Sequence, residues 1–241
     1  MLARLLPALV NFVLPPTCAS CDNVLPQTYG SQAGRLCAEC FDALSLHQGP
    51  RCAQCATRID TLFVHPDLRC GACLTKPPPF AATTAPLVYA GTARQLILGL
   101  KHGQRRTNAK VLADFIRPHL PPRDESWLLI PVPLHPSRLR QRGFNQSLEI
   151  ARNLPGPRLL FQGLKRTRAT DSQANKSARA RARNVAGAFA VTDHSAVKGA
   201  NILLIDDVVT SGATARAAAK TLRRAGARCV HILAAARALP T

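Results

Sequence analysis

Acidic residues are scarce in this chain of 241 residues, with 13 Asp and Glu against 32 Lys and Arg and a formal net charge of +19. A phosphate-rich partner would meet few repelling charges, so a nucleic-acid surface is one interpretation. A dispersed arginine-rich surface with no polyanionic partner is the other, and the sequence leaves both open. Aromatic residues are also few, at 5%, which argues against intimate base stacking but permits phosphate contacts.

Long apolar runs are absent, and no stretch is long enough to span a bilayer. The first fourteen residues hold an apolar run, but no small-residue cleavage site follows it before the first cysteine. We expect a short helix there that packs on its own protein. The 46% hydrophobic content is enough for one good core, or for one core with a small appended module.

Cysteine, by contrast, is abundant and regularly spaced. Eight of the nine cysteines form four Cys-x-x-Cys pairs, with fifteen residues between the first two pairs and fourteen between the second two. This spacing is typical of zinc ribbons rather than of secreted disulfide frameworks, and it favours the reducing cytoplasm. Closed four-thiolate sites leave no position for a substrate, so we expect about two structural zinc ions, with crossed pairing between the halves left open. The candidate ligands are Cys18, Cys21, Cys37, Cys40, Cys52, Cys55, Cys70 and Cys73.

A proline-rich linker follows the last cysteine pair. Lys76 precedes three prolines, which favour an extended connection between two units. We assign 1–76 to a double zinc ribbon with its short N-terminal helix, and 80–241 to a second domain. From Ala82 onward strands and helices alternate, and the strands predicted include Ala85–Ala90 and Asn184–Val191. This alternation predicts an α/β fold with a parallel sheet and helices on both sides. Ligands of such sheets bind at the carboxyl ends of the strands.

The most informative stretch is Asn201–Thr214, with the sequence NILLIDDVVTSGAT. Four branched apolar residues predict a buried strand, which ends in two adjacent carboxylates. The small residues that follow lead into a helix, whose N-terminus binds phosphate through its free N–H groups. The carboxylates would repel that phosphate and suit ribose hydroxyls or a magnesium ion instead. The predicted sugar-phosphate contacts are Asp206, Asp207, Thr210, Ser211, Gly212, Ala213 and Thr214.

The segment IDDVVTSGAT resembles the phosphoribosyl pyrophosphate (PRPP) signature of type I phosphoribosyltransferases, in which apolar residues and two acids precede T-[ST]-G-x-T. An ordinary buried strand followed by a turn does not explain two adjacent carboxylates at the end of an apolar run, because desolvated charges are costly without partners. The resemblance implies a type I phosphoribosyltransferase-like parallel sheet that binds PRPP with magnesium.

A second anion site is expected after the strand predicted at Trp127–Val132, where a turn is followed by basic residues. In type I phosphoribosyltransferases a loop after an earlier strand holds the pyrophosphate. The resemblance implies that role for Pro133, Leu134, His135 and Arg138. A basic loop before a helix N-terminus, with no such role, is the alternative.

The segment Lys165–Arg183 carries seven basic residues and a single acid, Asp171. Mutual repulsion should keep it mobile until an anion arrives. A solvated helix with a charged face is the alternative. Transferases of this class have a flexible loop that closes over the reacting centre and excludes water, and the resemblance implies that role for Arg179 and Arg183.

Nearly the whole chain resembles the ComF family of ComFC and GntX-like proteins. The features that carry this resemblance are the double zinc ribbon, the motifs LGLKHG, PVPLH and RGFNQ, and the PRPP signature. The family is linked to natural competence. The resemblance therefore implies a PRPP-binding protein in the cytoplasmic handling of incoming single-stranded DNA, with that DNA and competence proteins as partners. A true transferase that moves phosphoribose from PRPP to a nucleobase-like acceptor is the alternative, and no residue presents itself as a general base for such an acceptor.

Overall fold

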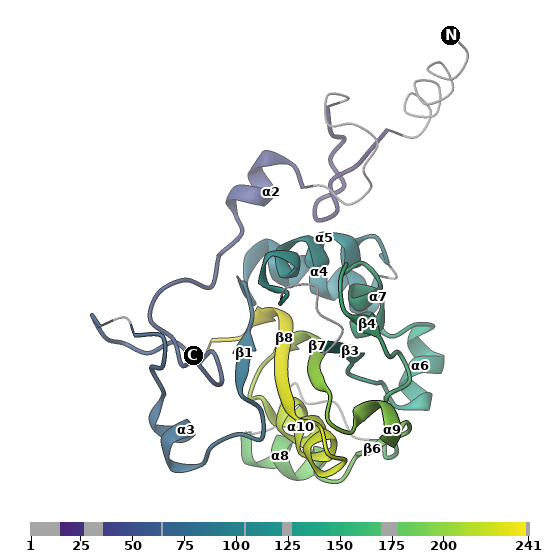
Figure 1. The fold of residues 1–241 in the computed structure, drawn as a ribbon. Helices are drawn as coiled ribbons and strands as arrows, with labels where there is room; N and C mark the ends of the chain where they lie inside the picture. Colours follow the sequence, from purple (N-terminus) through teal and green to yellow (C-terminus); the bar gives the residue numbers. More distant parts are fainter. Residues whose placement is uncertain are drawn as a thin grey trace.

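The computed structural model describes residues 15–26, 36–63, 65–103, 105–121, 127–169 and 178–239, without the side chains of 178, 179, 181 and 182. The helix expected in the first fourteen residues lies outside the described residues. Within them, two cysteine-rich segments precede an α/β unit (Figure 1). We call Cys18–Cys40 the first ribbon and Cys52–Cys73 the second ribbon.

The centre of the molecule is a sheet whose strands are all parallel, as the alternation of strands and helices predicted. Its strands are β1 (Ala82–Thr84), β2 (Leu87–Val88), β3 (Trp127–Pro131), β4 (Arg158–Leu159), β7 (Asn201–Val209) and β8 (Cys229–Arg237). They lie in the order β1-β8-β7-β3-β4, and β2 pairs with the end of β8. The two long central strands β7 and β8 are apolar through most of their length because both of their faces are covered.

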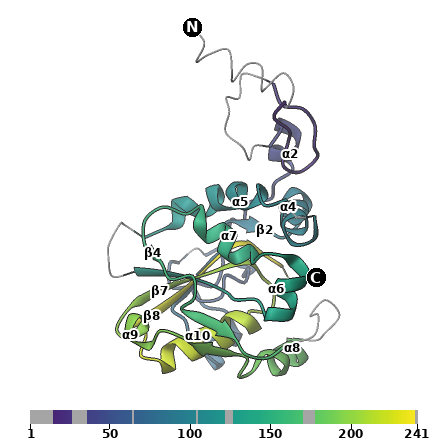
Figure 2. The same cartoon turned by 90° about the vertical axis from the view of Figure 1, so that its right-hand side faces the viewer.

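Helices cover both faces of this sheet (Figure 2). The helices of the α/β unit and its 3-10 turn are α4 (Gly91–His102), α5 (Asn108–Ile116), η2 (Arg117–His119), α6 (Pro136–Arg142), α7 (Gln146–Arg152), α8 (Ala178–Val185), α9 (His194–Val197) and α10 (Ala213–Arg224). Side chains alternate between the faces of a strand. Leu203 and Ile205 of β7 accordingly pack against α4, α5 and α7, whereas Ile202 and Leu204 pack against α10. Among the described helices, none is both long and apolar enough to cross a bilayer.

Three stretches differ from the sequence-based expectation. The strand expected at Ala85–Ala90 is replaced by β1 and β2 with a break at Pro86, which has no N–H to donate to a ladder. The basic loop expected after β3 contains a helix, α6, with Pro136 at its first position and Gly143, at φ 80°, after its last residue. The strand expected at Asn184–Val191 begins later, since α8 continues to Val185 and β6 (Phe189–Val191) pairs antiparallel with β5 (Leu164–Arg166).

The two ribbons share one backbone form. After the first Cys-x-x-Cys pair of each ribbon, a residue adopts a left-handed conformation that is uncommon outside glycine, namely Asp22 (φ 64°) and Ala56 (φ 55°). The N–H groups of these residues bond back to the carbonyls of Cys18 (3.0 Å) and Cys52 (2.9 Å). The second pair of each ribbon begins at the N-cap of a short helix, which is α2 (Ala38–Asp42) or α3 (Gly71–Thr75).

Candidate functional site

A pocket of about 800 Å³ opens at the carboxyl ends of β3 and β7. These strands are neighbours, with Pro131 opposite Ile205, so the segments that follow them meet there. Open α/β sheets bind their ligands at such an edge. Of the predicted contacts, the pocket is lined by Asp206, Asp207, Thr210, Thr214, Pro133, Leu134 and Arg138.

Asp207 is the buried member of the acidic pair. Its Oδ2 lies 2.8 Å from Nζ of Lys101 at the end of α4, and its Oδ1 accepts the N–H of Val208 at 2.7 Å. Burial alone would lower the pKa of Lys101, but the Asp207 carboxylate raises that pKa above its ordinary value. Both oxygens of Asp207 are therefore committed within the protein, and the lysine beside it is charged.

Asp206 is only half-buried, and its surroundings differ. Its Oδ1 accepts the hydroxyl of Ser147 at 3.2 Å and the N–H of Asp207 at 2.9 Å. Burial and the charge of Asp207 raise the pKa of Asp206 to about 7. Within the described part of the chain its Oδ2 makes no hydrogen bond or ion pair, so this oxygen is available to a ligand in the pocket.

The small-residue loop after β7 leads directly into α10. Gly212 is the N-cap of that helix at φ 72°, a conformation that a residue with a Cβ adopts only under strain. No side chain caps the helix, so its first N–H groups can meet phosphate oxygens. The buried Oγ of Ser211 has no hydrogen-bond partner among the described residues. A bound oxyanion would supply that partner.

Several pocket residues come from elements that the motif at β7 does not contain, and they are Lys101, Arg142, Gln146, Ser147 and Arg166. The first four belong to or adjoin the motifs LGLKHG and RGFNQ, but no sequence spacing rule relates them to the acidic pair. Gln146 is buried, and its Oε1 lacks a partner within the described ranges. Lys101, Arg142 and Arg166 are cations, and together with Arg138 they place four positive charges at the pocket. Such a lining suits a ligand with more than one anionic group.

Some predicted residues lie elsewhere. The Nδ1 of His135 accepts the N–H of Ser137 at 3.3 Å, so this ring caps α6 and is not part of the pocket lining. Ser211 and Gly212 of the adjoining loop and Ala213, the first residue of α10, do not line the pocket. Arg183 is exposed on α8, and the side chain of Arg179 lies outside the described residues. Their roles at a ligand stay predictions.

The eight predicted thiol ligands form two clusters, one in each ribbon, and the four Sγ atoms of each cluster lie within 4.8 Å of one another. The Sγ atoms of Cys21 and Cys37 are 3.7 Å apart, and those of Cys55 and Cys70 are 3.6 Å apart. Thiolates around a tetrahedral zinc ion with 2.3 Å bonds would lie about 3.8 Å apart. Both clusters fit a structural zinc ion, and pairing follows the halves rather than crossing between them.

Without a metal, the thiols of one cluster cannot all ionise. Burial acts to raise the pKa of Cys18, but the N–H groups of Cys21 and Cys37 lower it to about 6. Burial and the neighbouring thiols raise the pKa of Cys40 to about 12. A divalent cation would let all four sulfurs bind as thiolates, which is the state that zinc requires.

We expect about two zinc ions in each folded chain. Cys18→Ser and Cys52→Ser should each lose one ion, because a hydroxyl is a poor replacement for a thiolate ligand. Metal analysis of the purified variants checks this, with Cys229→Ser in β8 as the control that keeps both ions. A metal-free wild-type protein with folded ribbons would contradict the assignment.

The fold and the two thiol clusters define a phosphoribosyltransferase-fold protein that carries a double zinc ribbon. A family model described as a double zinc ribbon domain matches residues 9–74, and one described as a phosphoribosyl transferase domain matches residues 141–239. The DNA utilization protein YhgH of Escherichia coli (strain K12) is 35% identical over 175 residues, which are 68% of this chain and 75% of that relative. The chain therefore belongs to the ComF family, as its motifs predicted.

Two relatives named for competence match shorter segments. Competence protein F of Haemophilus influenzae is 34% identical over 115 residues, which cover 46% of this chain and 50% of the relative. Competence protein ComFC of Bacillus subtilis is 32% identical over 103 residues, which cover 43% of this chain and 41% of the relative. The name of the Escherichia coli relative thus refers to the use of DNA, and the names of these two relatives refer to competence.

Proposed function

We propose that this protein binds PRPP with magnesium in the pocket at β3 and β7, and that it serves the cytoplasmic handling of single-stranded DNA during natural competence. The observation that carries the first part is the meeting of Asp206, the glycine-containing start of α10 and four cations at one pocket. The names of the relatives support the second part.

In this proposal the segment Thr210–Thr214, here called the phosphate loop, holds the 5-phosphate with its hydroxyls and the first N–H groups of α10. Asp206 binds the ribose hydroxyls, directly or through magnesium. Arg138 and the neighbouring cations face the pyrophosphate. Magnesium, when bound, neutralises charge on the leaving pyrophosphate. Asp207 holds Lys101 charged at the edge of the pocket.

Magnesium PRPP should stabilise the protein against heat, because a ligand that binds only the folded state shifts the unfolding equilibrium. At a concentration of about 100 times the dissociation constant, the gain is about 2.7 kcal/mol. In a chain of this size we expect the melting temperature to rise by about 5–10 °C. Ribose 5-phosphate and pyrophosphate, tested separately with magnesium, should each produce a smaller rise. No shift with magnesium PRPP at millimolar concentration would exclude the proposed ligand.

A true phosphoribosyltransferase is the alternative function. It would release pyrophosphate from PRPP when an acceptor is supplied, because displacement at the anomeric carbon expels that group. Each nucleobase can be tested as acceptor with a coupled assay of pyrophosphate. Release above the rate without protein would establish the transferase, whereas tight PRPP binding without release would favour a PRPP-responsive protein.

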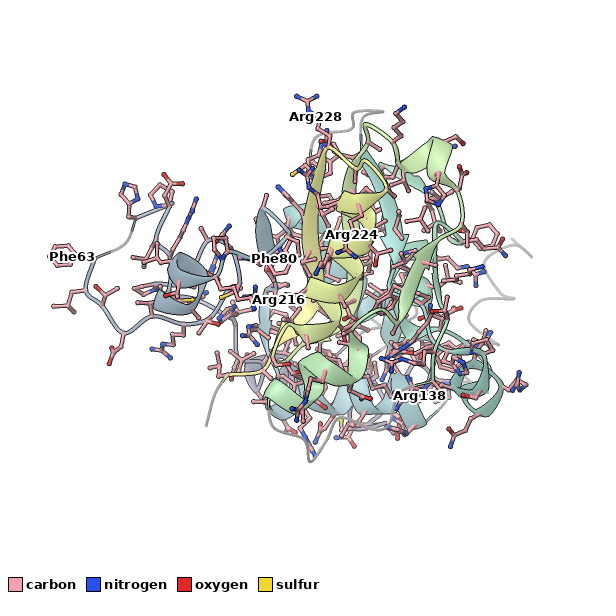
Figure 3. The ribbon with its side chains drawn as sticks, turned by 90° about the horizontal axis from the view of Figure 1, so that it is seen from below. Phe63, Phe80, Arg138, Arg216, Arg224 and Arg228 are labelled. Atoms are coloured by element: carbon pink, nitrogen blue, oxygen red, sulfur yellow. The ribbon has the colours of Figure 1, made fainter. Side chains whose placement is uncertain are left out.

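A basic face on α10 favours single-stranded DNA as a second ligand. Arg216, Lys220 and Arg224 recur every four residues, so they follow one side of the helix at steps of about 6 Å. Arg228 continues this row beyond the helix end (Figure 3). Lys220, Arg224 and Arg228 are exposed, and none of them forms an ion pair within the described part of the chain. The helix α8, which carries Arg183, packs against α10.

Binding of a short labelled strand should fall steeply with salt and depend little on base sequence, because phosphate contacts release counterions. Replacing Lys220, Arg224 and Arg228 with alanine should lower the slope of log affinity against log salt by about 2, at about 0.7 per lost contact on a single strand. The exposed helix tolerates alanine. The triple replacement of Arg179, Arg181 and Arg183 tests whether α8 contributes further. Absence of binding at low salt would leave PRPP as the sole proposed ligand.

A further inference from the structure

Arg237, the last residue of β8, is a buried arginine that joins two distant parts of the chain, with 6% of its surface exposed. Its Nη1 donates to the carbonyl oxygens of Val209 and Ala238, each at 2.9 Å, and to that of Thr210. Its Nη2 donates to Oγ1 of Thr57 at 3.0 Å. A buried guanidinium needs such partners, because an unpaired one is costly. Here the start of the phosphate loop supplies partners on one side and the second ribbon supplies one on the other.

The second ribbon presents its zinc-binding cysteines to this junction. The Oγ1 of Thr57 also lies 3.2 Å from Sγ of Cys55, and a zinc-bound thiolate at that position would accept the Thr57 hydroxyl. Another arginine, Arg216 in the first turn of α10, lies with Nη2 4.0 Å from Sγ of Cys73, and Figure 3 shows it at this end of α10. Four thiolates around a divalent ion leave a net charge of two minus. Arg216 and Arg237 therefore place two positive charges against a zinc-loaded second ribbon.

The first ribbon has the same cluster chemistry but a different attachment. Its Asp22 accepts both terminal nitrogens of Arg105, at 2.9 and 2.6 Å, and Ser20 donates to Gln95 on α4 at 2.6 Å. Among the described residues, these contacts lie on the helical layer and do not reach the phosphate loop. Of the two zinc sites, the second is thus the one linked to the phosphate-loop end of the fold, through Thr57 and Arg237 and through Arg216.

We propose that Arg237 is a positioning residue that ties the phosphate loop to the second ribbon, so that zinc in the second ribbon, and not in the first, sets the order of this loop. The extension to PRPP affinity rests on the proposed function of the pocket. A loop that is held in place before binding loses less conformational freedom when the ligand arrives. Coupling between two binding sites is reciprocal, so PRPP should in turn strengthen zinc binding at the second ribbon.

The first test needs no ligand. Hydrogen exchange of the peptide that contains Val209–Thr214 is compared in full-length wild type, Cys52→Ser and Cys18→Ser, with zinc content measured on each sample. We expect exchange at this peptide to accelerate about tenfold in Cys52→Ser and to stay within about twofold of wild type in Cys18→Ser, in line with a coupling of 5–150-fold. Equal exchange in all three proteins, or equal acceleration in both variants, would overturn the proposal.

A milder variant separates the link from the loss of a whole ribbon. Thr57→Val removes the hydroxyl between Cys55 and Arg237 but keeps the size of the side chain and all four cysteines. It should keep two zinc ions and still accelerate loop exchange severalfold. Arg237→Lys, which keeps the charge but not the forked geometry, should accelerate exchange less than Arg237→Gln does. Unchanged loop exchange in Thr57→Val would show that the ribbon does not act through this contact.

The last test uses magnesium PRPP. Calorimetry should show about tenfold weaker binding in Cys52→Ser and near wild-type binding in Cys18→Ser. A chelator competition on Cys18→Ser, which holds only the second zinc, should show about tenfold tighter zinc retention when PRPP is present. A wild-type protein that binds no PRPP would contradict the proposed function but not the link between the second ribbon and the phosphate loop. Equal PRPP affinity in both cysteine variants would overturn the inference about the second ribbon.

Discussion

Asp206→Asn should weaken the binding of magnesium PRPP by about 100-fold or more, equivalent to about 2.7 kcal/mol, while the fold and both zinc ions are retained. Asparagine keeps the shape of the side chain and still accepts from Ser147 and from the N–H of Asp207. It removes the charge that a ribose hydroxyl or a magnesium ion would use. The fold tolerates this loss because the protein already holds the carboxyl with a pKa of about 7. Isothermal titration calorimetry measures the affinity.

Asp114→Asn is the matched control, because Asp114 is a surface acid of α5 that is remote in sequence from the pocket motifs and, among the described residues, forms an ion pair with Arg117 alone. It should bind magnesium PRPP as the wild type does. A folded Asp206→Asn protein with wild-type affinity would refute the role given to the acidic pair.

The dependence on pH provides a second check on Asp206. A proton on this carboxyl competes with magnesium and with hydroxyl donors, so wild-type affinity should fall as the pH drops below 7, by at most tenfold per unit. In Asp206→Asn the residual affinity should lack this dependence. The effect on stability has the opposite sign. A folded-state pKa above the unfolded value of about 3.9 means that the ligand-free fold gains stability from this group as the pH falls from 7 towards 4.

The parts of the molecule that sequence predicted are those encoded by local patterns. In β7 the apolar run, the acidic pair and the glycine that precedes α10 are neighbours in sequence. Hydrophobic periodicity and residue type are therefore enough to predict this part of the site. The two cysteine clusters are also predictable, because the number of residues between two Cys-x-x-Cys pairs indicates which pairs form one zinc ribbon. The division at 76–80 stays a prediction.

What sequence did not predict arises from contacts between distant elements. The ion pair between Lys101 and Asp207 forms because α4 packs on β7. The hydrogen bond from Ser147 to Asp206 forms because α7 lies at the carboxyl end of the same strand. No spacing rule relates such residues in a single sequence. Arg237 gives no signal of its role in the sequence, because a single cation at the end of an apolar strand resembles a surface residue. The sequence predicts a loop at α6 because its basic residues show no apolar periodicity.

Lys101→Met should destabilise the protein by about 3 kcal/mol, the low end of the cost of breaking a buried ion pair, because Lys101 keeps some exposure. The side chain of Asp207 is 5% exposed, and its Oδ2 would lose its 2.8 Å partner beside a second carboxylate. Methionine matches the lysine stem in length, so packing changes little. Urea denaturation followed by circular dichroism measures the free energy of unfolding.

Arg117→Met is the matched control, because its ion pair with Asp114 has side chains that are 49% and 42% exposed. That variant should cost less than about 1 kcal/mol. The double variant Lys101→Met, Asp207→Leu replaces the buried pair by apolar groups and should recover most of the lost stability. Equal costs for the Lys101 and Arg117 variants would mean that Asp207 finds another counter-charge. Recovery in the double variant would show instead that Lys101 stabilises the fold by neutralising Asp207 next to the carboxylate that the ligand needs.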